Sequence, residues 1–260
     1  MFPKLISYHS FFLPTYGVMV ALAFLSALWI TVRLGKRAGL NPESITNVAI
    51  YCALAGLAGA KLFMFLFNFR EYWNDPGSIF TLSTLQAAGV YQGGFLLALV
   101  VAIYYMRRVQ LPALETFDVF SPGIALGHAI GRIGCFAAGC CWGTECHLPW
   151  AVTFRNPEAN QLTGVPLGVP LHPTQLYESI AEALIFGFLL WRIAKPHLAG
   201  SIFGLYLILY SSVRFMVEFI RNHEQGLYVG LSLTQWISLG TLALGIWLCS
   251  RHRRVASQAV

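Results

Sequence analysis

The chain has 260 residues, of which 57% are hydrophobic and only 11% are charged, and its formal net charge is +6. Soluble domains carry about a quarter charged residues, so this composition argues against a soluble enzyme and against a disordered chain. A nucleic-acid-binding protein is also a poor interpretation, because the basic residues stand in short clusters between apolar runs, as they do in membrane proteins. No nucleic-acid partner is therefore expected.

The apolar runs are long enough to cross a bilayer, since a transmembrane helix needs about 20 residues. Seven spans are expected, at 11–32, 45–69, 87–106, 119–141, 174–194, 200–220 and 231–249. The first is interpreted as a retained span, because only Lys4 precedes it and no small-residue cleavage site follows. The predicted fold class is an all-α integral membrane protein with about seven transmembrane helices, in one polytopic domain over residues 1–260.

The orientation in the membrane follows from the 17 lysines and arginines. Ten lie in the loops after the first, third and fifth spans and in the C-terminal tail, four lie on the opposite side, and three lie inside spans. The positive-inside rule then places the N-terminus outside and the C-terminus in the cytoplasm. The largest piece outside the spans, at about 142–173, is rich in proline and glycine. It is expected as an irregular loop or small cap on the periplasmic side, between the fourth and fifth spans.

Ionisable residues inside apolar spans are costly and indicate functional sites by default. Arg132 lies in the fourth span, and Arg214 and Glu218 lie one helical turn apart in the sixth. Arginine presents a fixed fork of donors suited to phosphate, and the nearest phosphate in a membrane is a phospholipid headgroup. The plainer alternative is that Arg214 neutralises Glu218 and that Arg132 neutralises Glu178 or Glu182.

Four segments resemble one known family. They are YQGG (91–94), GRIGCFAAGCCWG (131–143), LHPTQLYE (171–178) and GLYLILYSSVRFMVEFIR (204–221). In this order and combination they resemble the prolipoprotein diacylglyceryl transferases, along nearly the whole chain. The resemblance implies a bacterial inner-membrane enzyme with seven spans that transfers a diacylglyceryl group from phosphatidylglycerol to the lipobox cysteine of a preprolipoprotein. Glycerol phosphate is released, and neither a cofactor nor a metal is expected.

The resemblance also implies roles for individual residues. Arg132 and Arg214 match arginines that bear on the phospholipid headgroup, and Glu218 matches a glutamate one turn after the second arginine. The other matches are expected to bind substrate or to shape its site; they are Tyr16, Tyr210, Gly93, Gly94, Gly134, Gly143, His172, Pro173, Gln175, Tyr177 and Glu178.

Three positions depart from the family pattern. Gln92 stands where the family has a histidine, Cys135 where it has an asparagine, and Cys140 where it has a glutamate. Gln92 and Cys135 are still expected to line the substrate site. Glutamine hydrogen-bonds a headgroup but has no useful basicity, so Gln92 cannot take the proton of an acceptor thiol.

A replacement base is therefore needed. His128 is the candidate, because it lies one turn before Arg132 on the same helix face and imidazole titrates near neutral pH. The alternative for His128 is a hydrogen bond to a neighbouring carbonyl. Glu178 and Glu182 are further candidate bases.

Four cysteines fall within twelve residues, at Cys135, Cys140, Cys141 and Cys146. A disulfide or redox pair is one interpretation, because the outer side of the membrane is oxidising. A reactive thiol is another, since a nearby arginine favours the thiolate, and Cys140 and Cys141 are then catalytic. Small-residue packing and a metal site are the remaining interpretations, although the spacing C-x4-C-C-x4-C-H is not a standard zinc motif.

Two enzymatic functions are predicted as alternatives. The first is diacylglyceryl transfer from phosphatidylglycerol to a preprolipoprotein or another thiol acceptor, within the bilayer. The second is a divergent paralogue that uses its own cysteines for thiol transfer or redox chemistry on a different, small-molecule thiol. A non-catalytic lipid-binding or transport protein is a third interpretation.

Overall fold

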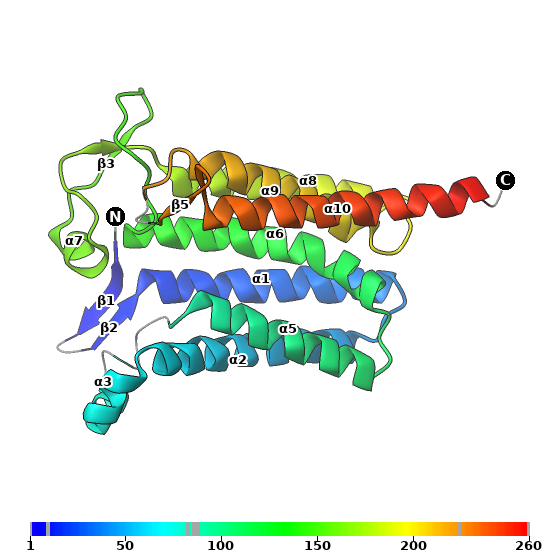
Figure 1. The fold of residues 1–260 in the computed structure, drawn as a ribbon, viewed down its shortest axis with the longest axis horizontal. Helices are drawn as coiled ribbons and strands as arrows, with labels where there is room; N and C mark the ends of the chain where they lie inside the picture. Colours follow the sequence, from blue (N-terminus) through cyan, green and yellow to red (C-terminus); the bar gives the residue numbers. More distant parts are fainter. Residues whose placement is uncertain (1, 9–10, 82–83, 85–88, 223–224, 259–260) are drawn as a thin grey trace. The chain divides into compact units, whose positions relative to one another are not determined.

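The structure is a computed structural model that describes residues 2–8, 11–81, 84, 89–222 and 225–258 (Figure 1). Most of these residues are helical. The chain divides into two compact units: unit 1 comprises Met1–Leu34 and Phe117–Val260, and unit 2 comprises Gly35–Thr116. Each unit is described by itself below.

The long helices follow the predicted spans. Among the described residues, those of 18 residues or more are α1 (Thr15–Arg37), α2 (Pro42–Phe67), α5 (Tyr91–Arg108), α6 (Ala113–Ala138), α8 (Thr174–Ile193), α9 (Ser201–Glu218) and α10 (Leu233–Gln258). Each overlaps one expected span; residues 87 and 88 of the third span lie outside the described residues.

Four of these helices are long and apolar enough to cross a membrane by length and composition: α1, α2, α9 and the Leu233–Arg251 part of α10. The hydropathy of the others is lowered by the polar groups that they carry. Two arginines end α5, while α6 contains Asp118 and Arg132, and α8 contains Glu178 and Glu182. A mostly helical protein with several potential membrane spans agrees with the predicted fold class.

Short β-hairpins precede the first and the last long helix, where only helix was expected. The first span was expected from residue 11, but β1 (Lys4–Tyr8) and β2 (Phe11–Pro14) form an antiparallel hairpin, and α1 begins only at Thr15. An apolar run has the same composition in a strand as in a helix, so hydropathy did not separate the two. Another short hairpin, β5 (Leu227–Tyr228) with β6 (Leu231–Ser232), precedes α10.

The segment at 142–173 is a small folded cap rather than an irregular loop. It contains β3 (Val152–Thr153) paired with β4 (Pro170–Leu171), and between them α7 (Pro157–Thr163). The side chain of Asn156 caps the first turn of α7, and Gly164 ends the helix in the left-handed conformation at φ 75°. The cap has its own buried apolar core, composed of Phe154, Ala159, Val165 and Leu171.

In unit 2, α2 and α5 pack at very short range. A Cβ atom on Gly93 would lie 2.6 Å from the carbonyl oxygen of Gly59, and one on Gly94 would lie 2.7 Å from that of Gly56. Only glycine therefore permits this approach of the two backbones. Farther along the same helices, Asn47 donates a hydrogen bond to the hydroxyl of Tyr105 at 3.1 Å. The short helices α3 (Phe69–Asn74) and η1 (Pro76–Phe80) follow α2.

In unit 1, α9 packs against α8 and runs side by side with α10 (Figure 1). The apolar core between α6, α8 and α9 includes Ala125, Leu189 and Ile202. The buried Asp118 of α6 accepts hydrogen bonds from two backbone N–H groups at the start of α9, those of Gly200 and Phe203, at 2.6 and 2.7 Å. A carboxylate thus satisfies donors that have no partner within their own helix.

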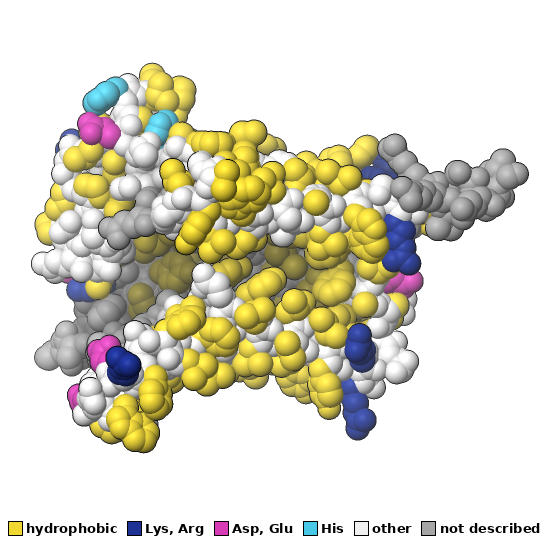
Figure 2. Space-filling model, viewed as in Figure 1, with side chains coloured by type: hydrophobic (Ala, Val, Ile, Leu, Met, Phe, Trp, Pro, Cys, Tyr) yellow, Lys and Arg dark blue, Asp and Glu magenta, His cyan; other side chains and the backbone are white. Residues whose placement is uncertain are grey.

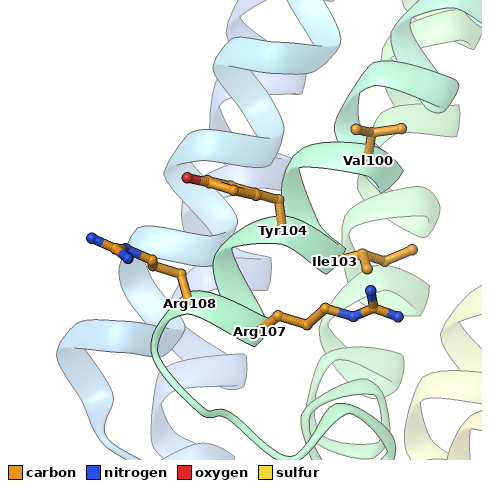
Figure 3. A pocket seen from close by; sticks show the side chains of 5 residues that line it. All are labelled: Val100, Ile103, Tyr104, Arg107 and Arg108. Atoms are coloured by element: carbon orange, nitrogen blue, oxygen red, sulfur yellow. The ribbon is translucent and has the colours of Figure 1, made fainter.

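The outer faces of the helices are apolar. Figure 2 shows hydrophobic side chains over the visible helix surfaces. Leu57 of α2 and Leu184 of α8, for example, are 69% and 70% exposed. In unit 2, a pocket on α5 is lined by Val100, Ile103, Tyr104, Arg107 and Arg108 (Figure 3). It contains none of the predicted site residues, and an aromatic ring beside two arginines is typical of a helix end at a membrane surface.

Candidate active site

Three arginines gather around one buried carboxylate in unit 1. Glu178 lies one turn into α8, and its side chain is 4% exposed. Its Oε2 atom is 2.5 Å from Nη2 of Arg132, and its Oε1 atom is 3.9 Å from Nη1 of Arg214 and 3.7 Å from Nη1 of Arg221. Arg214 also pairs with Glu218, at 2.7 Å between Nη1 and Oε2. These five residues are called the arginine–glutamate cluster.

Both expected pairings, Arg132 with Glu178 and Arg214 with Glu218, are therefore present, but they are joined into one cluster. The side chains of Arg132 and Arg214 are only 13% and 11% exposed. Burying ion pairs carries a desolvation cost that often exceeds the Coulombic gain, so mutual neutralisation is a weak reason to bury three arginines. The Nε atom of Arg132 also has no hydrogen-bond partner among the described residues, which leaves a buried donor for a ligand.

The N-terminus of α10 holds Glu218 in place. Ser232 caps α10: its hydroxyl accepts from the backbone N–H of Gln235, and the Gln235 side chain accepts from the backbone N–H of Ser232. This is a capping box, S-x-x-Q. The same Ser232 hydroxyl donates to Oε1 of Glu218 at 3.0 Å. The start of one helix thereby fixes the carboxylate at the end of another.

Arg221 reaches the cluster through Gly143, a predicted site residue. Gly143 forms an antiparallel bridge with Arg221, just beyond the end of α9, and its N–H donates to the carbonyl of His172 at 2.9 Å. A Cβ atom at Gly143 would lie 2.6 Å from the carbonyl oxygen of Ile220. Glycine is needed there because the two backbones and the segment before α8 meet at contact distance.

His128 lies against the acidic side of the cluster. Its Nδ1 atom is 3.3 Å from Oε1 of Glu182, and its Nε2 atom is 3.9 Å from Oε2 of Glu178. The hydroxyl of Ser179 donates to the carbonyl of Ala129 at 2.8 Å and ties α8 to α6 beside this contact. The expected alternative, a histidine bonded to a neighbouring carbonyl, is replaced by contacts with two carboxylates, and the ring remains 24% exposed.

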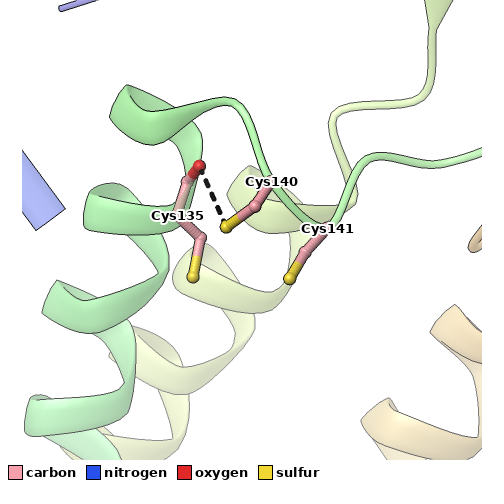
Figure 4. Close-up of side chains that lie close together, drawn as sticks. All are labelled: Cys135, Cys140 and Cys141. Atoms are coloured by element: carbon pink, nitrogen blue, oxygen red, sulfur yellow. Dashed lines mark hydrogen bonds between the residues drawn. The ribbon is translucent and has the colours of Figure 1, made fainter. Parts of the chain in front are cut away.

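Three of the four clustered cysteines come together next to Arg132. The Sγ atoms of Cys135, Cys140 and Cys141 all lie within 4.8 Å of one another (Figure 4). Cys135 Sγ is 4.0 Å from Nη1 of Arg132. Cys146 is not among them: it is buried in the cap, where its N–H donates to the carbonyl of Pro170. All four are free thiols.

The remaining predicted residues of unit 1 surround these groups. Tyr16 lies at the start of α1 next to Gly134 of α6, where an added Cβ would lie 3.5 Å from its ring and 2.8 Å from Met19. Tyr210 packs its ring 5.5 Å from that of His128, between centroids. Gln175 of α8 donates a hydrogen bond to the carbonyl of Cys140, in the loop after α6, and His172, just before α8, hydrogen-bonds the hydroxyl of Tyr177.

Gln92, Gly93 and Gly94 belong to unit 2. Gln92 is exposed in the first turn of α5. The two glycines serve the packing of α5 on α2 described above. Their expected part in substrate binding stays a prediction.

Arg221 was not predicted as a site residue, and Glu178 was predicted only as a family match and a further candidate base. Arg221 was counted among the charges of an outer loop. Helical spacing from Arg214 and Glu218 gave no signal for it, because α9 ends at Glu218 and the bridge to Gly143 places Arg221. The central place of Glu178 had no signal either, since it depends on contacts from three separate segments.

The fold and the cluster define a helical protein with several membrane-spanning candidates and a buried centre rich in arginine. The family model described as prolipoprotein diacylglyceryl transferase matches residues 3–251 of this chain. The chain belongs to that family and is therefore a transferase, which confirms the resemblance seen in its motifs.

Similar relatives span nearly the whole chain. The phosphatidylglycerol–prolipoprotein diacylglyceryl transferase of Clostridium tetani is 34% identical over 238 residues, which are 92% of this chain and 92% of the relative. A protein of the same description from Methylobacillus flagellatus is 33% identical over 257 residues, 95% of this chain and 94% of the relative. One from Clostridium perfringens, described as transferase 2, is 34% identical over 236 residues, 90% and 89%.

Proposed function

We propose that this protein transfers the diacylglyceryl group of phosphatidylglycerol to the cysteine thiol of a prolipoprotein and releases glycerol phosphate. The observation that carries the proposal is the gathering of Arg132, Arg214 and Arg221 around the buried Glu178. A membrane offers one abundant anion of the right chemistry for such a centre, the phosphodiester of a phospholipid headgroup. The family membership and the names of the relatives support the same reaction.

The reaction is a substitution at a glycerol carbon. The sulfur of the acceptor cysteine forms a bond to the carbon that bears the phosphate, the C–O bond breaks, and the oxygen leaves with its electron pair as glycerol phosphate. Negative charge grows on the departing phosphate, so guanidinium groups fixed in advance around it stabilise the transition state more than the bound lipid. Arg132 and Arg214 serve this role, and Arg221 completes the set.

The thiol proton is taken by His128. Its ring lies between Glu178 and Glu182, which orient it and stabilise the imidazolium that forms. Gln92 has no basicity to share in this step. Tyr16, Tyr210, Gly134 and the segment around His172 and Gln175 shape the site, and Glu218 holds Arg214 in position.

The proposed setting is the bacterial inner membrane, in which the seven long helices form one polytopic domain with the N-terminus outside. The apolar outer faces of α2 and α8 support this arrangement, since charged groups such as Glu178 are buried instead. The cap at 142–173 then lies on the periplasmic side, where the acceptor protein arrives.

Complementation tests the proposal. Cells depleted of their own prolipoprotein diacylglyceryl transferase should regain growth and thioether-linked lipid on a model lipoprotein when they express this chain. Arg132→Ala should abolish the rescue, and Arg155→Ala should retain it, because Arg155 is an exposed arginine of the cap. If the folded protein reaches the membrane and gives no rescue, the proposed reaction is wrong.

The same assay decides between this function and chemistry at the protein's own cysteines. The comparisons give that second function no support, but three adjacent thiols are a specific observation in its favour. A Cys140→Ser/Cys141→Ser double variant that still rescues would show that neither thiol is needed for transfer. Loss of rescue with retained folding would favour a reactive thiol.

A further inference from the structure

The three adjacent thiols are not explained by diacylglyceryl transfer, whose acceptor sulfur comes from another protein. Cys135 lies near the end of α6, and Cys140 and Cys141 lie in the loop that follows (Figure 4). Their sulfur atoms are all within 4.8 Å of one another. Each thiolate offers one soft ligand atom, and together they form a three-sulfur set.

The end of α6 creates the first contact. Gly139 is left-handed at φ 83°, the N–H of Cys140 donates to the carbonyl of Cys135, and the N–H of Gly139 donates to that of Phe136. These two bonds form a Schellman motif, in which the residues corresponding to Cys135 and Cys140 commonly touch. By itself this motif accounts for a pair of thiols and not for three.

The third thiol is brought in at a conformational cost. Cys141 has φ 63°, a left-handed conformation that disfavours residues with a side chain and that concentrates at functional positions. The start of α8 holds it there: the hydroxyl of Thr174 donates to the carbonyl of Cys141 at 2.7 Å, and the amide of Gln175 donates to that of Cys140 at 2.6 Å. The loop is therefore fixed with its sulfur atoms gathered before any ligand binds.

Positive charge lies beside two of the three sulfurs. Arg132 lies 4.0 Å from Sγ of Cys135, and both Arg132 and Arg221 act electrostatically on Cys141. Three thiolates with a monovalent cation carry a net charge of −2, which Arg132 and Arg221 offset in part, because both also pair with Glu178. Arg132 favours the thiolate forms of Cys135 and Cys141, and Arg221 favours that of Cys141.

We propose that Cys135, Cys140 and Cys141 form a binding site for a soft monovalent metal ion, copper(I). Thiolate ligands select soft ions, among them copper(I), zinc and iron–sulfur clusters. Zinc is almost always held by four ligands in structural sites, whereas Cys146, the nearest further cysteine in the sequence, lies apart in the cap. Metal–sulfur bonds of about 2.3 Å set ligand sulfurs about 4 Å apart, so a small contraction of the set is enough. Binding releases the thiol protons to solvent, and the oxidation state of the ion does not change.

Competition with a chelator tests the site. The full-length protein in detergent, reduced and freed of metal, is titrated with copper(I) in the presence of bicinchoninate, under exclusion of oxygen. The wild type should withhold one equivalent of copper(I) from the chelator. Cys140→Ser should weaken copper(I) binding at least tenfold, as should Cys135→Ser. The matched controls are Cys52→Ser and Cys249→Ser, in the helices α2 and α10, which should bind like the wild type.

Two results would overturn the proposal. One is a wild-type protein that withholds no copper(I); the other is a Cys140→Ser variant that withholds as much as the wild type. Because a serine variant can also fail by unfolding, X-ray absorption on the copper-loaded wild type provides an independent test. Three sulfur neighbours around the copper support the site, and fewer sulfurs, or nitrogen and oxygen in their place, reject it.

Discussion

Neutralising the central carboxylate with Glu178→Gln should strongly destabilise the folded protein. Glutamine keeps the volume and one carbonyl acceptor but removes the negative charge that Arg132, Arg214 and Arg221 share, at 2.5, 3.9 and 3.7 Å. Removing one partner of a buried ion pair costs about 3–5 kcal/mol. In a chain of this size each kcal/mol shifts the thermal midpoint by about 2–4 °C, which predicts a loss of about 6–20 °C.

The assay is thermal denaturation in detergent micelles, followed by far-ultraviolet circular dichroism. The matched control is Glu145→Gln, because the Glu145 side chain is 60% exposed and such a substitution changes stability by about 0.5 kcal/mol or less. Added phosphatidylglycerol should stabilise Glu178→Gln more than the wild type, since its phosphate replaces the missing negative charge. If Glu178→Gln melts with the midpoint of Glu145→Gln, the cluster does not depend on this carboxylate and the reasoning is refuted.

Arg214→Ala should abolish transfer from phosphatidylglycerol and Arg214→Lys should restore only part, because lysine lacks the bidentate fork; full transfer by the alanine variant would rule out the phosphate role. His128→Ala should slow the rate at saturating substrate by about 10²–10⁴-fold, and an unchanged rate would place the base elsewhere. Arg221→Ala should reduce transfer, and Gly143→Ala should do the same while the protein stays folded, because the new methyl group would push apart the two bridged segments. A Gly143→Ala variant with wild-type transfer beside an impaired Arg221→Ala variant would contradict this link. Asp118→Ala should cost about 1–3 kcal/mol in thermal or denaturant unfolding by leaving buried N–H groups at the start of α9 unsatisfied, with unchanged activity per folded molecule.

The positions of the long helices and the protein family could both be predicted from the sequence. Apolar runs of sufficient length located all seven long helices of the described chain, because in lipid the backbone has few ways to satisfy its hydrogen bonds. The hairpin of β1 and β2 was not predicted, because hydropathy does not distinguish apolar residues in a strand from apolar residues in a helix. The segment at 142–173 was expected as an irregular loop or a small cap, and its internal helix was not predicted, although Asn156 and Gly164 had the residue types that begin and end α7.

The site was only partly predictable. Arg214 and Glu218 could be paired because four residues make one helical turn, a relation fixed by local geometry. The position of Arg221 depends on a backbone bridge to Gly143, which lies 78 positions earlier in the chain. The four clustered cysteines could be seen as a group in the sequence, but it could not be predicted that three of them are adjacent and that Cys146 is not among them.

The sequence by itself determined the membrane class, the helices, the family and the charged residues that enter the apolar spans, because these follow from composition and from spacing within single segments. Only the tertiary structure decided that Glu178 stands at the centre, that His128 faces two carboxylates, and that Cys141 completes a set of sulfurs. Each of these depends on where α6, α8 and the chain after α9 meet. Contacts between segments are fixed by packing and backbone hydrogen bonds across the fold, and spacing along one segment does not encode them.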